Sequence, residues 1–362
     1  MNRRGFVLLP FGALVAAGAA RGAPGAAVVA YPAVVPGRAL RFPDDEGSHP
    51  DFRIEWWYAT GWLVDAAQRP LGFQITFFRN RPVDTGGNPS RFAPAQLLVA
   101  HAALSDPQHG RLRHDQQLAR AGFGLAGAAE RITDVHIGDW SLRSGGEALH
   151  ARMAGREFSL DLALRRTQPP LLHGGDGFSR KGPAPGSASY YYTLPHLAVT
   201  GNVVAGGKST SVTGTAWLDH EWSTAPMEPQ ATGWDWIGIN LDDGGAVMAF
   251  RMRGTGGDAL WSSATLRGAD GRSRTFAPEQ VTWTPVRNWR SARTGASYPV
   301  AWRVAVGELV LELEALMDDQ EMDARASTGT VYWEGAVTAR VRERVVGRGY
   351  LELTGYWRPF RL

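Results

Sequence analysis

The stretch WLDHEWS, residues 217–223, places Asp219, His220 and Glu221 side by side between two tryptophans. Carboxyl and imidazole groups are the side chains that most often transfer protons in enzymes. The stretch follows an alternating, strand-like run, and side chains alternate between the two faces of a strand. We therefore expect His220 to share one face with Trp222, and Asp219 to share the other face with Glu221.

Two interpretations of this trio remain open. In the first, Asp219, His220 and Glu221 are catalytic residues and Trp222 contributes to a ligand site. In the second, the carboxylates face solvent and His220 is a core histidine with satisfied hydrogen bonds. Burial of an unpaired charge is costly, so the trio needs one of these explanations.

Aromatic runs elsewhere contain isolated acidic residues. Glu55 opens EWWY and Asp235 lies within GWDWIGI. We predict that both carboxylates face an aromatic-lined space, with Glu55 as a further catalytic candidate and Trp57 and Asp235 as ligand-binding residues. The alternative is that each carboxylate is paired with an arginine.

Two further ligand-binding candidates come from the middle of the chain. Tyr192 lies in YYYTLPH, residues 190–196, where the alternative is that the tyrosines form barrel wall. Lys181 lies in HGGDGFSRKGPAPGSAS, residues 173–189, which is too rich in Gly and Pro to be a strand. This segment is interpreted either as a flap over the mouth of a first barrel or as a disordered connector.

Other kinds of site find no support in the sequence. The chain contains no Cys, which excludes disulfides and thiolate metal ligands. The spacing of His220 and its acidic neighbours is not an established zinc pattern, so no metal site is predicted. No GxSxG elbow, and no GxGxxG or phosphate-binding loop in a strand-to-helix context, is found, and no cofactor is predicted.

Strand patterns dominate the chain. Short runs rich in aromatic and β-branched residues alternate in polarity and are separated by Gly, Pro, Asp or Asn. Examples are RIEWWYATGWLV, LGFQITFFR, EFSLDLALR, HLAVTGNVV, SVTGTAWL, GWDWIGINL, AVMAFRMR, ELVLELEAL and YLELTGYW. The sequence therefore predicts an all-β protein.

The two halves of the chain resemble each other. Trp56, Tyr58, Leu63 and Asp65 match Trp234, Trp236, Leu241 and Asp243 without a gap, TFFRNR matches MAFRMR, LAVTGNV resembles GAVTARV, and residues 214–222 match residues 349–357. Such ordered matches indicate a duplication. We predict two β-barrels, because closure removes exposed sheet edges and a small barrel has room for one ligand.

The duplication bears on the acidic trio. The second half reads Thr354-Gly355-Tyr356 where the first reads Asp219-His220-Glu221, and Glu55 is matched by Gly233. The fold can therefore be built without these ionisable groups. Their presence in one copy favours a functional role.

The chain begins with features of an export signal. Arg3 and Arg4 precede a short apolar run rich in Ala and Gly, close to the twin-arginine pattern. We expect residues 1–27 to be the signal, residues 28–224 and 225–362 to be the two barrel domains, and the protein to be periplasmic. Removing Arg3, Arg4 and Arg21 from the 38 basic residues leaves 35 against 35 acidic ones, so nucleic-acid binding is not predicted.

Several motifs together resemble the carotenoid 1,2-hydratase family and its AttH-like relatives. They are HPDFRIEWWYATGWL, GFQITFFR, YYYTLPHLAVTG, GTAWLDHEWS and GWDWIGINLDDG, in order across roughly residues 45–358. The resemblance implies two lipocalin-like β domains with an apolar cavity. Family members hydrate carotenoids, more distant relatives cyclise polyenes or prenylated rings, and many AttH-like members have no assigned activity.

The resemblance also implies roles for particular residues. The hydratases are thought to use the His and second Trp of a DHxW motif, which correspond to His220 and Trp222. They also use a Tyr and an acidic residue on a following strand, where this chain has Phe250 and Met252. That departure weakens the case for carotenoid hydration.

Three functions follow as hypotheses. In the first, Asp219 or Glu221, or else Glu55, protonates an alkene while His220 handles water and tryptophan faces stabilise a carbocation. In the second, the protein carries a lipid, isoprenoid or quinone unchanged. In the third, it is an accessory factor in contact with a membrane or an exporter. The sequence predicts no oligomeric state.

Overall fold

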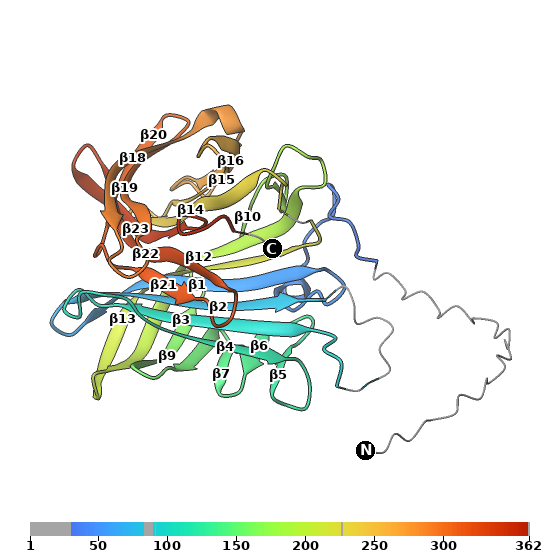
Figure 1. Ribbon diagram of the computed structural model, residues 1–362. Helices are drawn as coiled ribbons and strands as arrows, with labels where there is room; N and C mark the ends of the chain where they lie inside the picture. The colour runs from blue at the N-terminus through green and yellow to red at the C-terminus, as the bar shows by residue number, and fades with distance from the viewer. Residues whose placement is uncertain (1–29, 83–89, 91, 226, 361–362) are drawn as a thin grey trace, which may run out of the picture.

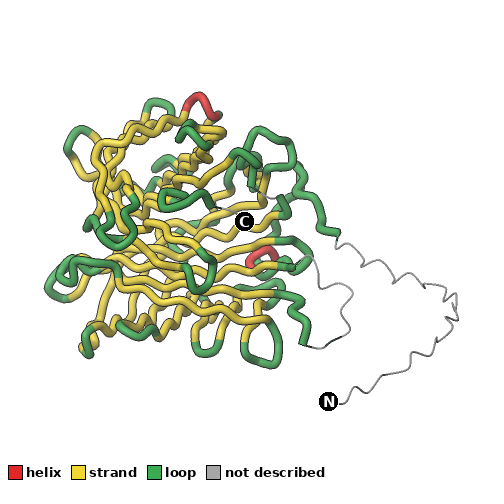
Figure 2. The backbone as a smooth tube through the Cα atoms, in the orientation of Figure 1, coloured by secondary structure: helices red, strands yellow, loops and turns green. Residues whose placement is uncertain are grey.

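The computed structural model describes residues 30–82, 90, 92–225 and 227–360. These residues form two antiparallel sheets of 13 and 10 strands, stacked on each other in Figure 1. Their only helical segments are the short 3-10 turns Asp44–Glu46 and Pro278–Gln280, drawn red in Figure 2. The prediction of an all-β protein with two lipocalin-like barrels is confirmed. The proposed signal, residues 1–27, lies outside the described residues.

The first sheet holds strands β1 to β13 in the order β4-β3-β2-β1-β13-β12-β9-β8-β7-β6-β5, with β10 and β11 added to β12. It curls round until β4 lies against β6. The strands are β1 Ile54–Asp65, β2 Pro70–Asn80, β3 Leu97–Ser105, β4 Arg113–Arg120, β5 Ala126–Ala128, β6 Asp134–Ile137, β7 Trp140–Gly145, β8 Ala148–Ala154, β9 Phe158–Arg165, β10 Leu171–Leu172, β11 Phe178–Arg180, β12 Ala188–Ala205 and β13 Lys208–Ser223.

The second sheet runs in the order β17-β16-β15-β14-β23-β22-β20-β19-β18, with β21 added to β22. It curls until β16 lies against β18. The strands are β14 Ala231–Leu241, β15 Ala246–Gly254, β16 Ala259–Arg267, β17 Ser273–Phe276, β18 Val281–Arg290, β19 Ser297–Val306, β20 Leu309–Ala315, β21 Glu321–Ala324, β22 Thr330–Val341 and β23 Arg344–Leu353. No helix in the described part of the chain is long and apolar enough to span a membrane.

The strand order repeats between the sheets. In the first, β1 lies between β2 and the hairpin β12–β13; in the second, β14 lies between β15 and the hairpin β22–β23. The copies differ in length, because β13 continues to Ser223 whereas β23 ends at Leu353. Residues 219–222 therefore occupy a strand extension that the second copy lacks.

Strands at the centre of the molecule are buried on both faces. In β1, Trp57, Ala59 and Leu63 point into the first barrel, whereas Tyr58 and Trp62 face the second barrel. We call the apolar layer between the two barrels the seam. Its buried members are Tyr58, Trp62, Leu171, Tyr191, Trp217, Ala231, Trp236, Ala246, Met248, Phe250, Met252, Ala336 and Tyr350.

Residues 173–189 are not a disordered connector. The segment contains β11, which pairs with β12, and the Arg180 carbonyl accepts a hydrogen bond from Trp261 Nε1 of the second barrel at 3.1 Å. Residues 30–52, which we call the covering segment, lie over the end of the first barrel where β1 begins. There Phe42 packs edge-on against Tyr192.

Candidate functional site

Strand β13 separates two groups of functional side chains. His220 and Trp222 point into the first barrel beside Trp57, and Asp219 and Glu221 point into the seam. This is the alternation that the sequence pattern predicts. The four residues therefore belong to two distinct environments rather than to one cluster.

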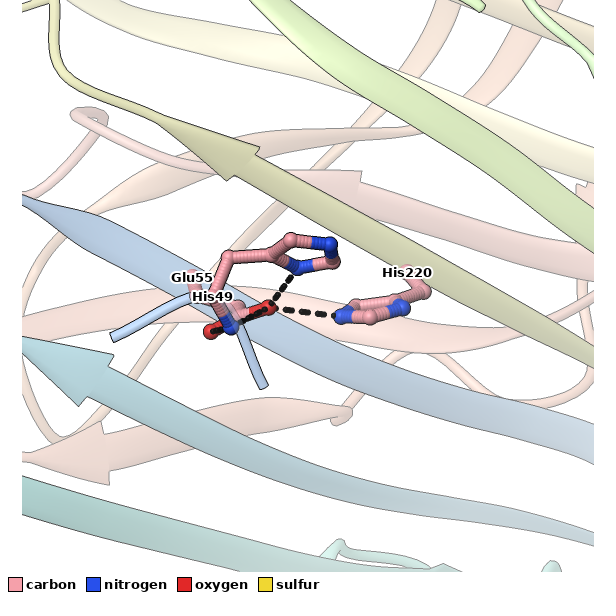
Figure 3. Close-up of side chains that lie close together, drawn as sticks. All are labelled: His49, Glu55 and His220. Carbon is pink, nitrogen blue, oxygen red and sulfur yellow. Dashed lines mark hydrogen bonds and ion pairs between the residues drawn. The ribbon is translucent and has the colours of Figure 1, made fainter. Parts of the chain in front are cut away.

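The interior group is centred on Glu55, which is completely buried. Its Oε1 atom lies 2.8 Å from Nδ1 of His49 and 2.9 Å from Nε2 of His220. Dashed lines mark both interactions in Figure 3. Its Oε2 atom accepts a hydrogen bond from Nε of Arg79 at 2.7 Å. Glu55 thus joins the covering segment, β2 and β13 through a single carboxylate.

Glu55 is held in its ionised form. Burial alone raises its pKa, but hydrogen bonds from His220 and His49 and the charge of Arg79 outweigh burial and leave the pKa well below its usual value. Burial lowers the pKa of His220 despite the neighbouring carboxylate. Glu55 is therefore not suited to donate a proton, and its role as a catalytic acid has no support in this geometry.

Aromatic rings enclose the interior group. The His49 ring stacks on Trp222 with their ring centroids 3.7 Å apart, and the His220 ring stacks on Trp57 with their centroids 4.7 Å apart. Tyr192 lies with its hydroxyl 3.2 Å from Nδ1 of His220. Trp57, Trp222 and Tyr192 thus surround His220, as a ligand-site assignment requires, but in this structure they pack against the histidines themselves.

His49, Glu55 and His220 have donor atoms within 4.8 Å of one another, near enough in principle to share a metal ion. In the structure both imidazoles direct a nitrogen at the same carboxylate oxygen, and the Arg79 cation occupies the other oxygen. Hydrogen bonding therefore engages each of these donor atoms. We interpret the group as a hydrogen-bonded network that fixes the covering segment to the barrel.

Asp219 is the central residue on the seam side. It is 3% exposed, and its carboxyl accepts hydrogen bonds from the Tyr191 hydroxyl and from Nε1 of Trp217, both at 2.6 Å, and from the Thr193 hydroxyl. No described cation is paired with it. Burial raises the pKa of Asp219 to about 7, even though the three hydrogen bonds act in the opposite direction.

A second layer supports Asp219. Nε2 of His173 lies 2.6 Å from the Thr193 hydroxyl, and Nε1 of Trp236 donates to the Tyr191 hydroxyl at 3.1 Å. Burial holds the pKa of His173 well below its usual value, so its ring is neutral. The network His173–Thr193–Asp219 is thus continuous inside the seam.

Glu221, by contrast, has a cationic partner. Its carboxylate lies 3.0 Å from Nζ of Lys181, and that ammonium also lies over the rings of Tyr191 and Phe250. Burial raises the pKa of Glu221, and the Lys181 charge opposes the change. Lys181 is therefore a structural counter-ion here.

Phe250 and Met252 both face the seam on β15. Two more carboxyl groups lie at this layer, buried Glu334 and half-buried Glu352, which are opposite each other on β22 and β23. Burial raises the pKa of both, that of Glu334 to about 8.

Asp235 and Glu55 both lie among aromatic side chains, but in the interiors of different barrels. Asp235 lies inside the second barrel, where it pairs with Arg251 and Arg253. The register of the strands explains the difference, because Asp235 is opposite Arg251 just as Glu55 is opposite Arg79. Each barrel thus has its own interior acid–arginine pair, which is the alternative that the sequence left open.

Sequence reasoning missed several residues of the site. His49 begins the HPDFRIE motif, and Arg79 matches Arg251 in the duplicated TFFRNR and MAFRMR segments, so both had a signal in the sequence. Tyr191 and Thr193 are the immediate neighbours of Tyr192 in YYYTLPH, the run in which the sequence predicts a ligand-binding residue. His173 had no signal, because its contact with Thr193 depends on the path of residues 173–189 along β12.

The family model described as AttH-like matches residues 33–356. A crystal structure of a Nitrosomonas europaea protein provisionally identified as AttH is 53% identical, with a TM-score of 0.85, and covers 90% of this chain and 99% of its own.

Two other solved structures share the fold. Kievitone hydratase from Nectria haematococca is 14% identical, with a TM-score of 0.69, and covers 91% of this chain and 97% of its own. The protein CghA, solved with Sch210972, is 12% identical with a TM-score of 0.50 and covers 84% of this chain and 88% of its own. No curated protein matches the chain.

Proposed function

The chain belongs to the AttH-like family, and from this premise we propose that it is a hydratase-type protein that acts on an alkene in an apolar ligand. Asp219 supplies the proton. The ligand is an isoprenoid or another lipid-like molecule, since the seam offers mainly aromatic and aliphatic side chains.

One observation carries this proposal: Asp219 is a buried carboxyl group with no cationic partner among the described residues, and its pKa of about 7 leaves a large protonated fraction near neutrality. Protonation of an unactivated alkene needs a neutral acid in an apolar environment. The other acids that the sequence predicted are less suitable, because Glu55 is ionised by its neighbours and Glu221 is paired with Lys181.

The proposed reaction balances with Asp219 alone. The alkene π electrons take the Asp219 proton and form a C–H bond, which leaves a cation on the other carbon and an Asp219 carboxylate. Water then adds to the cation through a new C–O bond, and the carboxylate removes the extra proton from that oxygen. In a cyclisation, a second double bond of the ligand attacks instead of water, and loss of a proton restores the acid.

Aromatic faces are available to stabilise the cation. The rings of Trp217 and Trp236 lie 6.3 Å apart beside Asp219, and Tyr191 links them through its hydroxyl. A cation over an aromatic face gains on the order of 1–2 kcal/mol once water is excluded. His220 cannot take part directly, because its ring lies on the far side of β13.

The test is incubation of the protein with an isoprenoid and lipid extract in isotopically labelled water, followed by mass spectrometry. Asp219→Asn serves as the inactive comparison, because it keeps the size of the side chain. A product with labelled oxygen that disappears in Asp219→Asn supports the proposal. A hydrated product of equal yield from both proteins would show that Asp219 is not the acid.

A carrier function is the second candidate. It is favoured by the three protein donors that reach the Asp219 carboxyl, the Tyr191 and Thr193 hydroxyls and Nε1 of Trp217, because they satisfy both carboxyl oxygens. In that case the labelled-water experiment yields a chemically unchanged ligand. The ligand is bound equally by the wild-type protein and by Asp219→Asn. A further alternative is an accessory role in the cell envelope, in which the protein contacts a membrane or an exporter.

The periplasmic location is also a proposal, and it rests on Arg3, Arg4 and the apolar run that follows them. Fractionation of cells that produce the full chain, compared with Arg3→Lys/Arg4→Lys, tests it. If the wild-type protein is found in the periplasmic fraction and the double variant is not, export by the twin-arginine route is supported.

A further inference from the structure

The interior of the second barrel contains a charged group that the proposed reaction does not use. Asp235 is fully buried and accepts hydrogen bonds from Nε and Nη2 of Arg251, from Nε of Arg253 at 3.1 Å, and from the Tyr356 hydroxyl at 2.9 Å. Two guanidinium groups therefore share one carboxylate. Asp235 balances only one of the two positive charges.

The corresponding arginine of the first barrel is fully engaged. Arg79 donates from Nε to Glu55, from Nη1 to Gln96 and from Nη2 to the carbonyls of His49 and Phe52. Arg251 differs, because its Nη1 makes no hydrogen bond to any residue that the structure describes, and its side chain is 13% exposed. The second copy thus keeps the acid–arginine pair but leaves one edge of the guanidinium open.

Two indole rings lie against this open guanidinium. The Arg251 Cζ atom is 5.1 Å from the ring of Trp302 and 5.8 Å from that of Trp283, and the two rings are 5.6 Å apart. Trp302 is 1% exposed and Trp283 is 8% exposed. Nε1 of each indole is buried without a hydrogen-bond partner in the described chain.

The three nitrogen atoms without a hydrogen-bond partner among the described residues are all donors. A buried donor without an acceptor is unfavourable, and most buried polar groups in proteins do have a partner. Here the two buried indole N–H groups and Nη1 of the partly exposed Arg251 are all donors. A ligand that completes this group must bring acceptor oxygens.

We propose that the second barrel binds the carboxylate of a small apolar acid at Arg251, Trp283 and Trp302. The carboxylate accepts hydrogen bonds from Arg251 Nη1 and the two indole nitrogens, and it offsets the excess positive charge of the arginine pair. The aromatic rings of Trp283 and Trp302 line the position of the apolar body. This site is separate from Asp219 and independent of the reaction proposed for the seam.

The experiment uses the full chain labelled with nitrogen-15 at tryptophan, so that each indole N–H gives a signal in a proton–nitrogen NMR spectrum. Trp283→Phe and Trp302→Phe assign the two signals of interest. Benzoate and hexanoate are the probes, and benzamide is the neutral isostere of benzoate. We expect saturable shifts of the Trp283 and Trp302 signals with both acids and no comparable shift with benzamide.

The reference signal is that of Trp140, whose indole donates to the Ala154 carbonyl in the first barrel at 3.0 Å. It should not move. No saturable shift of the Trp283 and Trp302 signals with either acid at about 10 mM, a concentration that detects even millimolar binding, overturns the proposal. Equal binding of benzamide and benzoate also overturns it.

Two variants test the electrostatic part in opposite directions. Arg251→Lys keeps the charge but loses the planar donors, and we expect the benzoate dissociation constant to rise about tenfold. Asp235→Asn keeps the side-chain size and removes the competing carboxylate, so we expect binding to tighten. Damage to the barrel would weaken benzoate binding in both variants, so the folding of each variant is checked by its NMR spectrum. If Asp235→Asn is folded and binds benzoate more weakly than wild type, the proposal is contradicted.

Discussion

Asp219 and His220 are adjacent in the chain, but their side chains lie on opposite faces of β13, Asp219 in the seam and His220 inside the first barrel. Strand geometry makes this separation unavoidable. The DHEW motif therefore contributes to two sites at once. Asp219 is available for acid chemistry, whereas His220 joins the network that holds the covering segment through His49 and Glu55.

Asp219→Asn should abolish turnover without preventing ligand binding. The amide keeps the shape: its oxygen can still accept from Trp217 and Thr193, and its NH2 group can donate to the Tyr191 hydroxyl. The amide cannot deliver a proton. General acids contribute factors of about 10² to 10⁴ in rate, and we expect a loss in that range. Rates are measured by product formation in labelled water and ligand affinity by calorimetry; a rate within about threefold of wild type would exclude Asp219 as the acid.

The pH dependence should follow the same carboxyl group. Its pKa in the folded protein is about 7, against 3.8 for an ordinary Asp. Turnover should fall as the pH rises through 7, because the proton needed for the alkene is then lost. The matched measurement is the pH–rate profile, and a rate that increases through this range would be incompatible with an acid at Asp219.

Stability should change in the same pH window. Between about pH 4 and pH 7 the folded protein retains the Asp219 proton and the unfolded chain has lost it, so the free energy of unfolding decreases as the pH rises. Asp219→Asn removes this contribution. The difference in unfolding free energy between the variant and wild type should therefore grow in favour of the variant from pH 4 to pH 7, by a few kcal/mol at most. Urea unfolding at several pH values measures it, and a constant difference would contradict the raised pKa.

The sequence predicts the fold well because each strand keeps its period, and the duplication repeats the strand order. It also predicts which side chains of residues 219–222 share a face. Periodicity does not reveal which faces two barrels bury against each other. Asp235 shows a related limit: the sequence places it in the second barrel domain, but not in that barrel's interior opposite Arg251.

Long-range contacts account for the rest of the candidate site. His49 reaches Glu55 from the covering segment, and Lys181 reaches Glu221 across 40 positions of the chain. Neither contact follows from local patterns, because each depends on how an irregular segment crosses the barrels. Burial has the same origin: the raised pKa of Asp219 comes from the second barrel closing over the seam.

Glu55→Gln should destabilise the protein strongly. The substitution leaves Arg79 buried without its counter-ion, and breaking a buried ion pair costs about 3–5 kcal/mol. The control is Asp51→Asn, which removes the partner of Arg81 in a pair whose acid is 82% exposed and should cost less than about 1 kcal/mol. Chemical denaturation measures both, and similar losses in the two variants would mean that the interior network contributes little to stability.

Lys181→Met should make stability depend on the charge of Glu221. Without Lys181, the Glu221 carboxylate is buried with no cation, and we expect a loss of about 3–5 kcal/mol at pH 8. The loss should be smaller at about pH 5, because burial and the missing ammonium raise the pKa of Glu221 and let it retain its proton there. The double variant Lys181→Met/Glu221→Gln removes both charges and should recover most of the stability at pH 8. Unfolding free energies of the three proteins at the two pH values provide the comparison. If the double variant were no more stable than Lys181→Met, the loss would come from the contacts of the lysine with Tyr191 and Phe250 rather than from an uncompensated charge.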